Sequence, residues 1–194
     1  MKTQLELATP QVDFAALQDI GRKLLVAIGQ DPNNPDLKKT PDRFARWWRE
    51  FIEYNSGSIN TVFETKNIDQ VIVISGMRIW SICEHHLLPF YCHVSIGYIP
   101  NGRVLGLSKF ARVSHLVAHK PQTQEKLAQE IADIISKVTK SKDVAVLACG
   151  EHLCMLMRGI KTEGLMTSCV TKGVFRKESS ARAEFMEIAK GVKP

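Results

Sequence analysis

Two short segments of the sequence bring together residue types that bind metal ions and transfer protons. The first is Cys83-Glu84-His85-His86, in which Cys83 and His86 have Cys-x-x-His spacing. A tight turn with this spacing can place a thiolate and an imidazole on one tetrahedral zinc ion. Two polar residues at the end of a strand give the same pattern, so this segment alone leaves both interpretations open.

The second segment is EHLC, in which His152 and Cys154 lie two positions apart. We expect a strand over 152–159, on which these two side chains share a face because side chains alternate along a strand. Cys154 is then a third candidate ligand. A closed structural zinc site needs a fourth ligand, for which Cys149 or Cys92 is available. A catalytic zinc instead keeps an open position for water.

Two further histidines favour the open, catalytic form of the site. His85 and His152 adjoin the candidate ligands, and histidine titrates close to neutral pH. Such residues can give and take protons beside a metal-bound water. The alternative is that one of them is a core histidine whose hydrogen bonds are satisfied within the fold.

Several basic residues form a candidate anion site. They lie at the start of an expected helix, on the expected strand after Cys154, and near the start of an N-terminal helix. The residues are Lys109 and Arg112 beside Ser108, then Arg158, and finally Arg43 and Arg46. Free N–H groups at a helix start attract anions, and several cations together can hold a polyphosphate. Each cation taken alone is more commonly a solvated surface charge.

An acidic residue opens the long helix that we expect in the second half of the chain. Glu125, preceded by Gln124, stands in its first turn. A carboxylate there is stabilised by the helix N-terminus. It could equally accept two hydrogen bonds from an amidine-like edge such as the N1–H and 2-amino group of guanine. The residues alone leave both interpretations open.

The hydrophobic spacing predicts which elements position these residues. Helices are expected over 13–29, 40–54 (with Thr40 as N-cap), 108–119, 121–140 and 179–190. Strands are expected over 71–74, 91–99, 103–107, 143–149, 152–159 and 166–175, with a hairpin turn at 100–102. This order predicts an α+β fold with an antiparallel sheet and helices on one face. We divide the chain into an N-terminal helical segment, 1–60, and a catalytic domain, 61–194.

The composition is that of a globular protein. The 194 residues are 44% hydrophobic and 24% charged, which excludes disordered and collagen-like chains. The net charge of +6 is spread out, so we expect no nucleic-acid partner, while an anionic substrate fits. The five cysteines are an odd number, which argues against a disulfide framework. No apolar stretch reaches the roughly 18 residues of a membrane span, and no signal peptide is evident, so we expect a cytoplasmic protein.

The motifs, taken together, resemble those of the GTP cyclohydrolase I family. CEHHLLPF, GLSKFAR, QTQEKL, EHLCMLMRG and the closing GVFR occur in the family's order. KTPDRFARWW is similar to the family's N-terminal helix, and IPNGRVLGLSK is similar to its hairpin. The resemblance extends from about residue 15 to about residue 190, and five separate motifs make it specific.

The resemblance implies a fold, an assembly and a reaction. The fold is the tunnelling fold, a four-stranded antiparallel sheet backed by two long helices. Such subunits join their sheets into a pentameric barrel, and two pentamers form a homodecamer with active sites at subunit interfaces. The reaction converts GTP and water to 7,8-dihydroneopterin triphosphate and formate, the first step of folate, biopterin or 7-deazaguanine synthesis. Which of these pathways uses the product stays open.

The resemblance also implies a role for each candidate site residue. The Zn²⁺ ligands are Cys83, His86 and Cys154. His152 protonates the purine nitrogen, His85 is a second acid–base group, and Ser108 assists near the ribose and phosphates. Glu125 with Gln124 recognises guanine. The triphosphate contacts are Lys109, Arg112 and Arg158, together with Arg43 and Arg46.

Three alternatives remain beside this interpretation. A related cyclohydrolase could use ferrous iron and yield a cyclic phosphate, but the two cysteines Cys83 and Cys154 favour zinc. A nitrile reductase of the same fold would need a cysteine nucleophile in place of this ligand set. A structural zinc module would close the site with four ligands and have no activity. Substitution of His152 separates the enzyme from the structural module.

Overall fold

The computed structural model describes residues 10–59, 61–65 and 68–191. The chain forms two compact units that divide between Asn55 and Ser56, and each is described by itself. In the described ranges, no helix combines the length and the apolar character that a membrane crossing requires.

The N-terminal unit is a pair of helices, α1 (Phe14–Ala27) and α2 (Thr40–Ile52). Asp13 caps α1, because its carboxylate accepts a hydrogen bond from the Ala16 amide. The expected N-cap of α2 is wrong: Lys39 is the cap, and Thr40 is already helical. A Cβ on Gly21 would lie 3.1 Å from Pro41 Cα, so glycine allows a close approach of the two helices.

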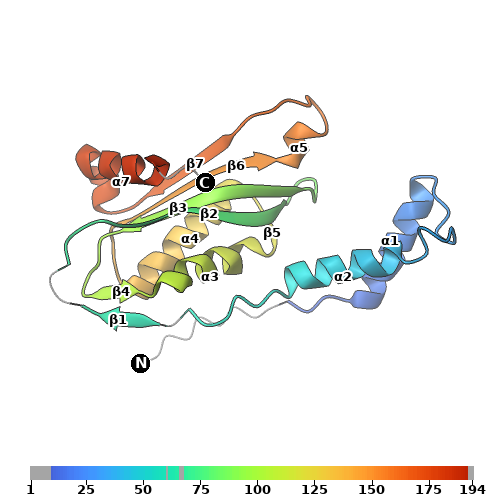
Figure 1. Cartoon of the computed structure of the whole chain (residues 1–194), viewed down its shortest axis with the longest axis horizontal. Helices are drawn as coiled ribbons and strands as arrows, with labels where there is room; N and C mark the ends of the chain where they lie inside the picture. The colour runs from blue at the N-terminus through green and yellow to red at the C-terminus, as the bar shows by residue number, and fades with distance from the viewer. Residues whose placement is uncertain (1–9, 60, 66–67, 192–194) are drawn as a thin grey trace. The chain divides into compact units, whose positions relative to one another are not determined.

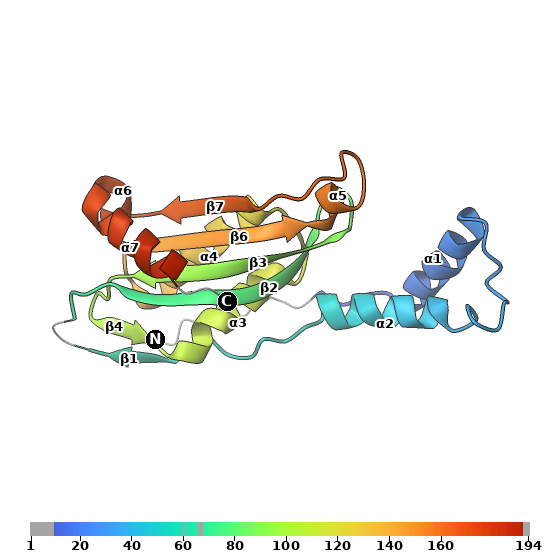
Figure 2. The same cartoon turned by 45° about the horizontal axis from the view of Figure 1, so that its top comes forward.

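The larger unit is built on a five-stranded sheet with the order β5-β2-β3-β6-β7. Figure 2 shows β2, β3, β6 and β7 in this order. Each neighbouring pair among the four long strands is antiparallel, and the short β5 is parallel to β2. Their bounds are β2 (Ile72–Cys83), β3 (Pro89–Tyr98), β5 (Pro121–Gln122), β6 (Val144–His152) and β7 (Met166–Thr171). A separate two-stranded sheet pairs β1 (Val62–Glu64) with β4 (Arg103–Leu105). The predicted α+β class with an antiparallel sheet is confirmed.

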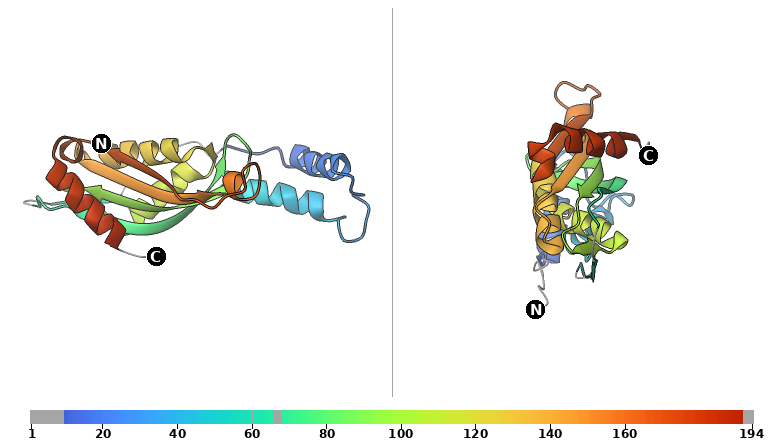
Figure 3. Two further views of the ribbon diagram at one scale, coloured as in Figure 1. Left: turned by 90° about the horizontal axis from the view of Figure 1, so that it is seen from above. Right: turned by 90° about the vertical axis from the view of Figure 1, so that its left-hand side faces the viewer.

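Helices cover both faces of this sheet, whereas the sequence predicted helices on one face only. Two of them, α3 (Leu107–Ala118) and α4 (Gln124–Thr139), lie on one face, and α7 (Ser179–Gly191) crosses the other (Figures 1 and 3). Glycine at position 97 makes room for α7, since a Cβ there would be 2.5 Å from the Phe185 ring. That contact joins residues far apart in sequence, so hydrophobic spacing could not reveal it.

The hydrophobic core consequently has two layers. The larger one lies between the sheet and α3 with α4, and it includes Phe90, Val94, Phe110, Leu127 and Ile131. The smaller one lies under α7 and α6 (Val174–Lys177), and it is formed by Ala145, Leu147, Phe175, Phe185 and Ala189.

The strand expected over 152–159 is also wrong. The strand β6 ends at His152, and the chain then makes one helical turn, α5 (Leu153–Leu156). The sheet register explains this end, because His152 pairs with Phe90 and the next partner along β3 would be Pro89. Proline has no N–H to donate, so the hydrogen-bond ladder stops there. The expected helix over 121–140 begins only at Gln124, capped by the Thr123 hydroxyl.

Candidate metal centre and active site

The first candidate segment forms the closed turn between β2 and β3. The Cys83 amide donates to Leu88 O at 2.8 Å, and the Leu87 amide donates to Cys83 O at 2.9 Å. Leu87 has a positive φ of 53°, which lets the chain reverse in so few residues. The turn therefore fixes His86 beside Cys83, as the Cys-x-x-His spacing predicts.

Cys154 completes this group from the one-turn helix α5. The candidate ligand atoms of Cys83, His86 and Cys154 all lie within 4.8 Å of one another. Tetrahedral zinc with bonds of about 2.0–2.3 Å holds its ligand atoms a little under 4 Å apart, so a small contraction closes the three atoms around one ion. Cys154 reaches this position through the helical turn and not through a strand face shared with His152.

The charges of the group also suit a divalent cation. Burial, and then the nearby Cys83 thiol, raise the pKa of Cys154, because two neighbouring thiolates in a partly desolvated site repel each other. A bound cation removes that repulsion and favours both thiolates. Two soft sulfur donors with one imidazole are a donor set that zinc prefers.

The two cysteines considered as a fourth ligand do not join the group. Cys92 is fully buried in the core, and burial raises the pKa of its thiol to about 12, which disfavours the thiolate that metals bind. Cys149 accepts a hydrogen bond from the Thr167 hydroxyl at 3.5 Å. Within the described part of the chain, the candidate ligand group thus has three members, as an open site requires.

His152 occupies a fixed position at the end of β6. Its imidazole stacks on the Phe90 ring with a centroid distance of 4.5 Å, and its Nε2 lies 3.1 Å from Gln124 Oε1. Burial lowers the pKa of His152, and the negative charge of Glu125 opposes that shift only in part. The ring is therefore neutral at neutral pH and carries one N–H and one free lone pair.

His85 occupies a more open position on the turn that carries Cys83 and His86. Its side chain is 65% exposed, and its Nδ1 lies 3.8 Å from Cys83 Sγ. The adjacent Glu84 carboxylate binds the Lys126 ammonium at 2.8 Å, and this ion pair links the turn to the first turn of α4. The hydrogen bond from Lys126 lowers the pKa of Glu84, so the carboxylate stays charged.

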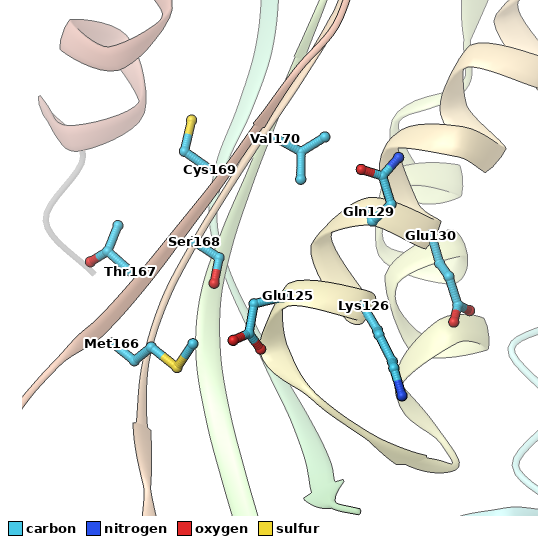
Figure 4. A pocket seen from close by; sticks show the side chains of 9 residues that line it. All are labelled: Glu125, Lys126, Gln129, Glu130, Met166, Thr167, Ser168, Cys169 and Val170. Atoms are coloured by element: carbon cyan, nitrogen blue, oxygen red, sulfur yellow. The ribbon is translucent and has the colours of Figure 1, made fainter.

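A cavity of about 670 Å³ lies between the beginning of α4 and the strand β7. Glu125 and Lys126 contribute to one wall, and residues 166–170 contribute to the other. Figure 4 shows the Glu125 carboxylate between the helix and the strand, on the side of Met166 and Ser168. The sequence singled out Glu125 but missed the wall formed by β7, because nothing local in that segment marks it.

The expected cations fall into three places. Arg158 contacts the metal-ligand candidate His86 through its guanidinium. Lys109, at the start of α3, donates to Ser58 O at 2.8 Å, and the Arg112 guanidinium is close enough to Gly57 to exclude a Cβ there. The other two expected cations belong to the N-terminal unit.

The remaining expected residues are a serine at the start of α3 and the two arginines of the N-terminal unit. Ser108 is exposed in the first turn of α3. Arg46, in the N-terminal unit, pairs with Asp42 of its own helix at 2.6 Å, and Arg43 lies in the same helix.

Comparison with known proteins agrees with the motifs. The model of the family "GTP cyclohydrolase I" matches residues 17–190. GTP cyclohydrolase 1 of Aquifex aeolicus is 39% identical over 182 residues, which cover 93% of this chain and 99% of the relative. GTP cyclohydrolase 1 of Dehalococcoides mccartyi is 42% identical over 183 residues, covering 91% and 96%. Among solved structures, the apo form of archaeosine synthase QueF-Like aligns with a TM-score of 0.39 at 18% identity, covering 51% of this chain and 91% of that one.

The family match and the relatives extend over the turn that carries Cys83 and His86, the end of β6 and the first turn of α4. The chain therefore belongs to the GTP cyclohydrolase I family, and it is an enzyme that converts GTP to 7,8-dihydroneopterin triphosphate and formate.

Proposed function

We propose that Cys83, His86 and Cys154 hold a catalytic zinc ion with one open coordination position. The observation that carries this proposal is the group itself: three soft donors lie within 4.8 Å of one another, without a fourth among the described residues. A zinc ion bound there supplies a Lewis acid that lowers the pKa of a coordinated water toward about 7. The same set of donors, with its two thiolates, favours zinc over ferrous iron.

The two histidines beside this group divide the proton transfers. His152, held neutral by burial and fixed against Phe90, is suited to exchange a proton with the purine nitrogen as the imidazole ring of GTP opens. His85 is mostly exposed, so it can exchange protons with solvent during deformylation and ribose opening. Separate environments for two groups of the same type are a common way to give them different roles.

Glu125 is the proposed guanine reader. Its carboxylate lies at the wall of the 670 Å³ cavity, which has the size of a small-molecule site. Two carboxylate oxygens can accept hydrogen bonds from the guanine N1–H and 2-amino group at once. Because a base without the 2-amino group loses one of these bonds, this residue provides discrimination as well as affinity.

The triphosphate is the proposed partner of the basic residues. Arg158 lies beside the metal-ligand group, so it can bind phosphate oxygens next to the reacting purine. Lys109 and Arg112, with Ser108, belong to the start of α3 and are proposed to contact the triphosphate and ribose. Arg43 and Arg46 of the N-terminal unit are further proposed triphosphate contacts.

A tunnelling-fold homodecamer is the proposed assembly, with each active site shared between neighbouring subunits. The strand β7 is the last strand of the sheet, so it presents an edge of N–H and C=O groups that another strand can pair with. Large apolar side chains are also exposed near the sheet, including Trp80 and Leu165. Free cysteines and a nucleotide substrate fit a cytoplasmic enzyme.

Turnover of GTP by the purified full-length chain tests these assignments. We expect formate release, neopterin fluorescence after oxidation, loss of both with a chelator, and their return with zinc. Mass spectrometry of the product separates the alternatives, because an iron-dependent relative would yield a cyclic phosphate in place of the triphosphate. The His152→Ala variant should lose turnover and keep one zinc per chain. A variant that loses its zinc would show that the ligand assignment is wrong, and wild-type protein that binds zinc without turnover would indicate a structural site.

A further inference from the structure

The side chain of Gln124 is fully buried, and both ends of its amide are engaged. The Nε2 group donates to Ala148 O at 3.0 Å and to Met166 O at 2.9 Å, with Ser168 Oγ at 3.3 Å. The Oε1 atom lies 3.1 Å from His152 Nε2. Gln124 therefore connects the first turn of α4 to β6, to β7 and to the proposed proton-transfer histidine.

These partners determine which way the amide faces. Backbone carbonyl oxygens only accept hydrogen bonds, so the two carbonyls of Ala148 and Met166 require the NH₂ group on their side. The carbonyl oxygen of the Gln124 side chain is then directed at His152. Because that oxygen also only accepts, His152 must carry its proton on Nε2, and Nδ1 is left as the nitrogen with a free lone pair.

The ring has little freedom to leave this arrangement. Phe90, itself fully buried, stacks on the imidazole with an angle of 4° between the ring planes. The stack fixes the plane of the ring, and the hydrogen bond to Gln124 fixes its rotation within that plane. Gln124 is held in turn by two strands of the sheet, so its position does not depend on a flexible loop.

The same contacts leave Gln124 poorly placed to read a base. Its two N–H donors are taken by main-chain carbonyls, and its side chain is absent from the lining of the cavity that Glu125 borders. A reader residue presents free donors or acceptors to the ligand. Glu125 meets that condition, and its neighbour in the sequence does not.

We propose that Gln124 is a positioning residue, which holds the His152 imidazole in one orientation and as the Nε2–H tautomer, and that it makes no contact with guanine. This inference rests on the proposed role of His152 in proton transfer. It separates two adjacent residues, Gln124 and Glu125, into one that orients the catalytic histidine and one that recognises the substrate. An imidazole held in this way keeps Nδ1 as its proton-accepting nitrogen, so it takes up a proton there before it gives one to the purine nitrogen.

Kinetics of the full-length, zinc-loaded enzyme test the proposal. Gln124→Met should lower kcat about 10–100-fold, as outer residues that orient reacting groups commonly do, while KM for GTP stays within about twofold. The preference for GTP over ITP, which lacks the 2-amino group, should not change. Glu125→Gln should instead raise KM and weaken the preference for GTP.

Gln122→Met is the matched control, because Gln122 is another buried glutamine whose amide donates to Val117 O and Glu130 and does not contact His152. Its kcat should stay within about twofold of the wild type even if stability falls. A raised KM or a changed GTP-to-ITP preference in Gln124→Met, with kcat retained, would assign Gln124 to base recognition and overturn the proposal. An equal loss of kcat in Gln122→Met would reduce the effect to general destabilisation.

Neutron diffraction from deuterium-exchanged crystals of the wild-type holoenzyme gives a second test that needs no variant. A deuteron on His152 Nε2, pointing at Gln124, is expected, whereas a deuteron on Nδ1 alone would contradict the assignment. If His152→Ala keeps wild-type turnover, the proposed role of His152 in proton transfer is wrong. The neutron result would still show whether His152 Nε2 donates a hydrogen bond to Gln124. The two failures are thus distinguishable.

Discussion

The imidazole of His152 lies flat against the phenyl ring of Phe90, with 4.5 Å between the ring centroids and 4° between the ring planes. The two residues are direct partners in the register of β3 and β6. The stack therefore ties the end of β6 to the start of β3, immediately after the turn that carries Cys83 and His86. The proposed proton-transfer histidine and the candidate metal ligands share one rigid support as a result.

Replacing Phe90 by leucine should loosen the histidine more than it harms the fold. Because leucine fills much of the volume but offers no ring face, we expect a stability loss of roughly 1–2 kcal/mol and a kcat lower by about tenfold. Phe175→Leu is the matched control, since Phe175 is equally buried in the layer under α7. Thermal unfolding and steady-state kinetics measure both effects, and equal losses of kcat in the two variants would disprove a special role for the stack.

Cys154→Ser should remove the metal, because a serine hydroxyl is a far weaker zinc ligand than a thiolate. We expect zinc content after gel filtration to fall well below one per chain, and turnover to fall with it. Cys149→Ser should keep its zinc, because Cys149 stands outside the ligand group. Metal analysis by mass spectrometry compares the two variants. Loss of zinc from Cys149→Ser would mean that the site is closed by a fourth protein ligand.

Gly150 allows β3 and β6 to pack closely just before His152. A Cβ at this position would lie 2.1 Å from Tyr91 O and 2.7 Å from Cys92 Cβ, and main-chain atoms cannot move aside cheaply. Gly150→Ala should therefore cost on the order of 3 kcal/mol or prevent folding. Gly191→Ala, at the end of α7 with no atom within 4 Å of the added Cβ, should melt close to the wild type. Similar melting temperatures for both variants would contradict the argument.

The sequence predicted which residues form the candidate ligand group better than it predicted the elements that carry them. Cys83 and His86 follow from spacing within one turn, which is local information. Cys154 reaches the same group although the strand expected around it is a helical turn. That turn begins where the pairing of β6 with β3 ends, at His152 and Phe90 next to Pro89, and only the sheet register places those residues together. The alternation of hydrophobic residues in one segment does not show which strand that segment pairs with.

Gln124 shows the same limit for a single side chain. Its hydrogen-bond partners are 24 to 44 residues away in sequence, on two different strands. From the sequence it is one of two adjacent polar residues at a helix start, and the resemblance gives both the same role. Burial and the directions of two carbonyls separate them, and these are properties of the assembled sheet.

The sheet separates a large hydrophobic layer, shared with α3 and α4, from a small one under α6 and α7. A helix held by the smaller layer can detach while the strands next to the candidate ligand group stay paired. Hydrogen–deuterium exchange of the holoenzyme should show this as earlier labelling of α7 amides than of α4 amides. The free energy of opening α7 should then be lower than the free energy of global unfolding. Equal exchange rates in the two helices would mean that the unit opens only as a whole. The C-terminal helix would then be as much a part of the catalytic scaffold as the sheet it covers.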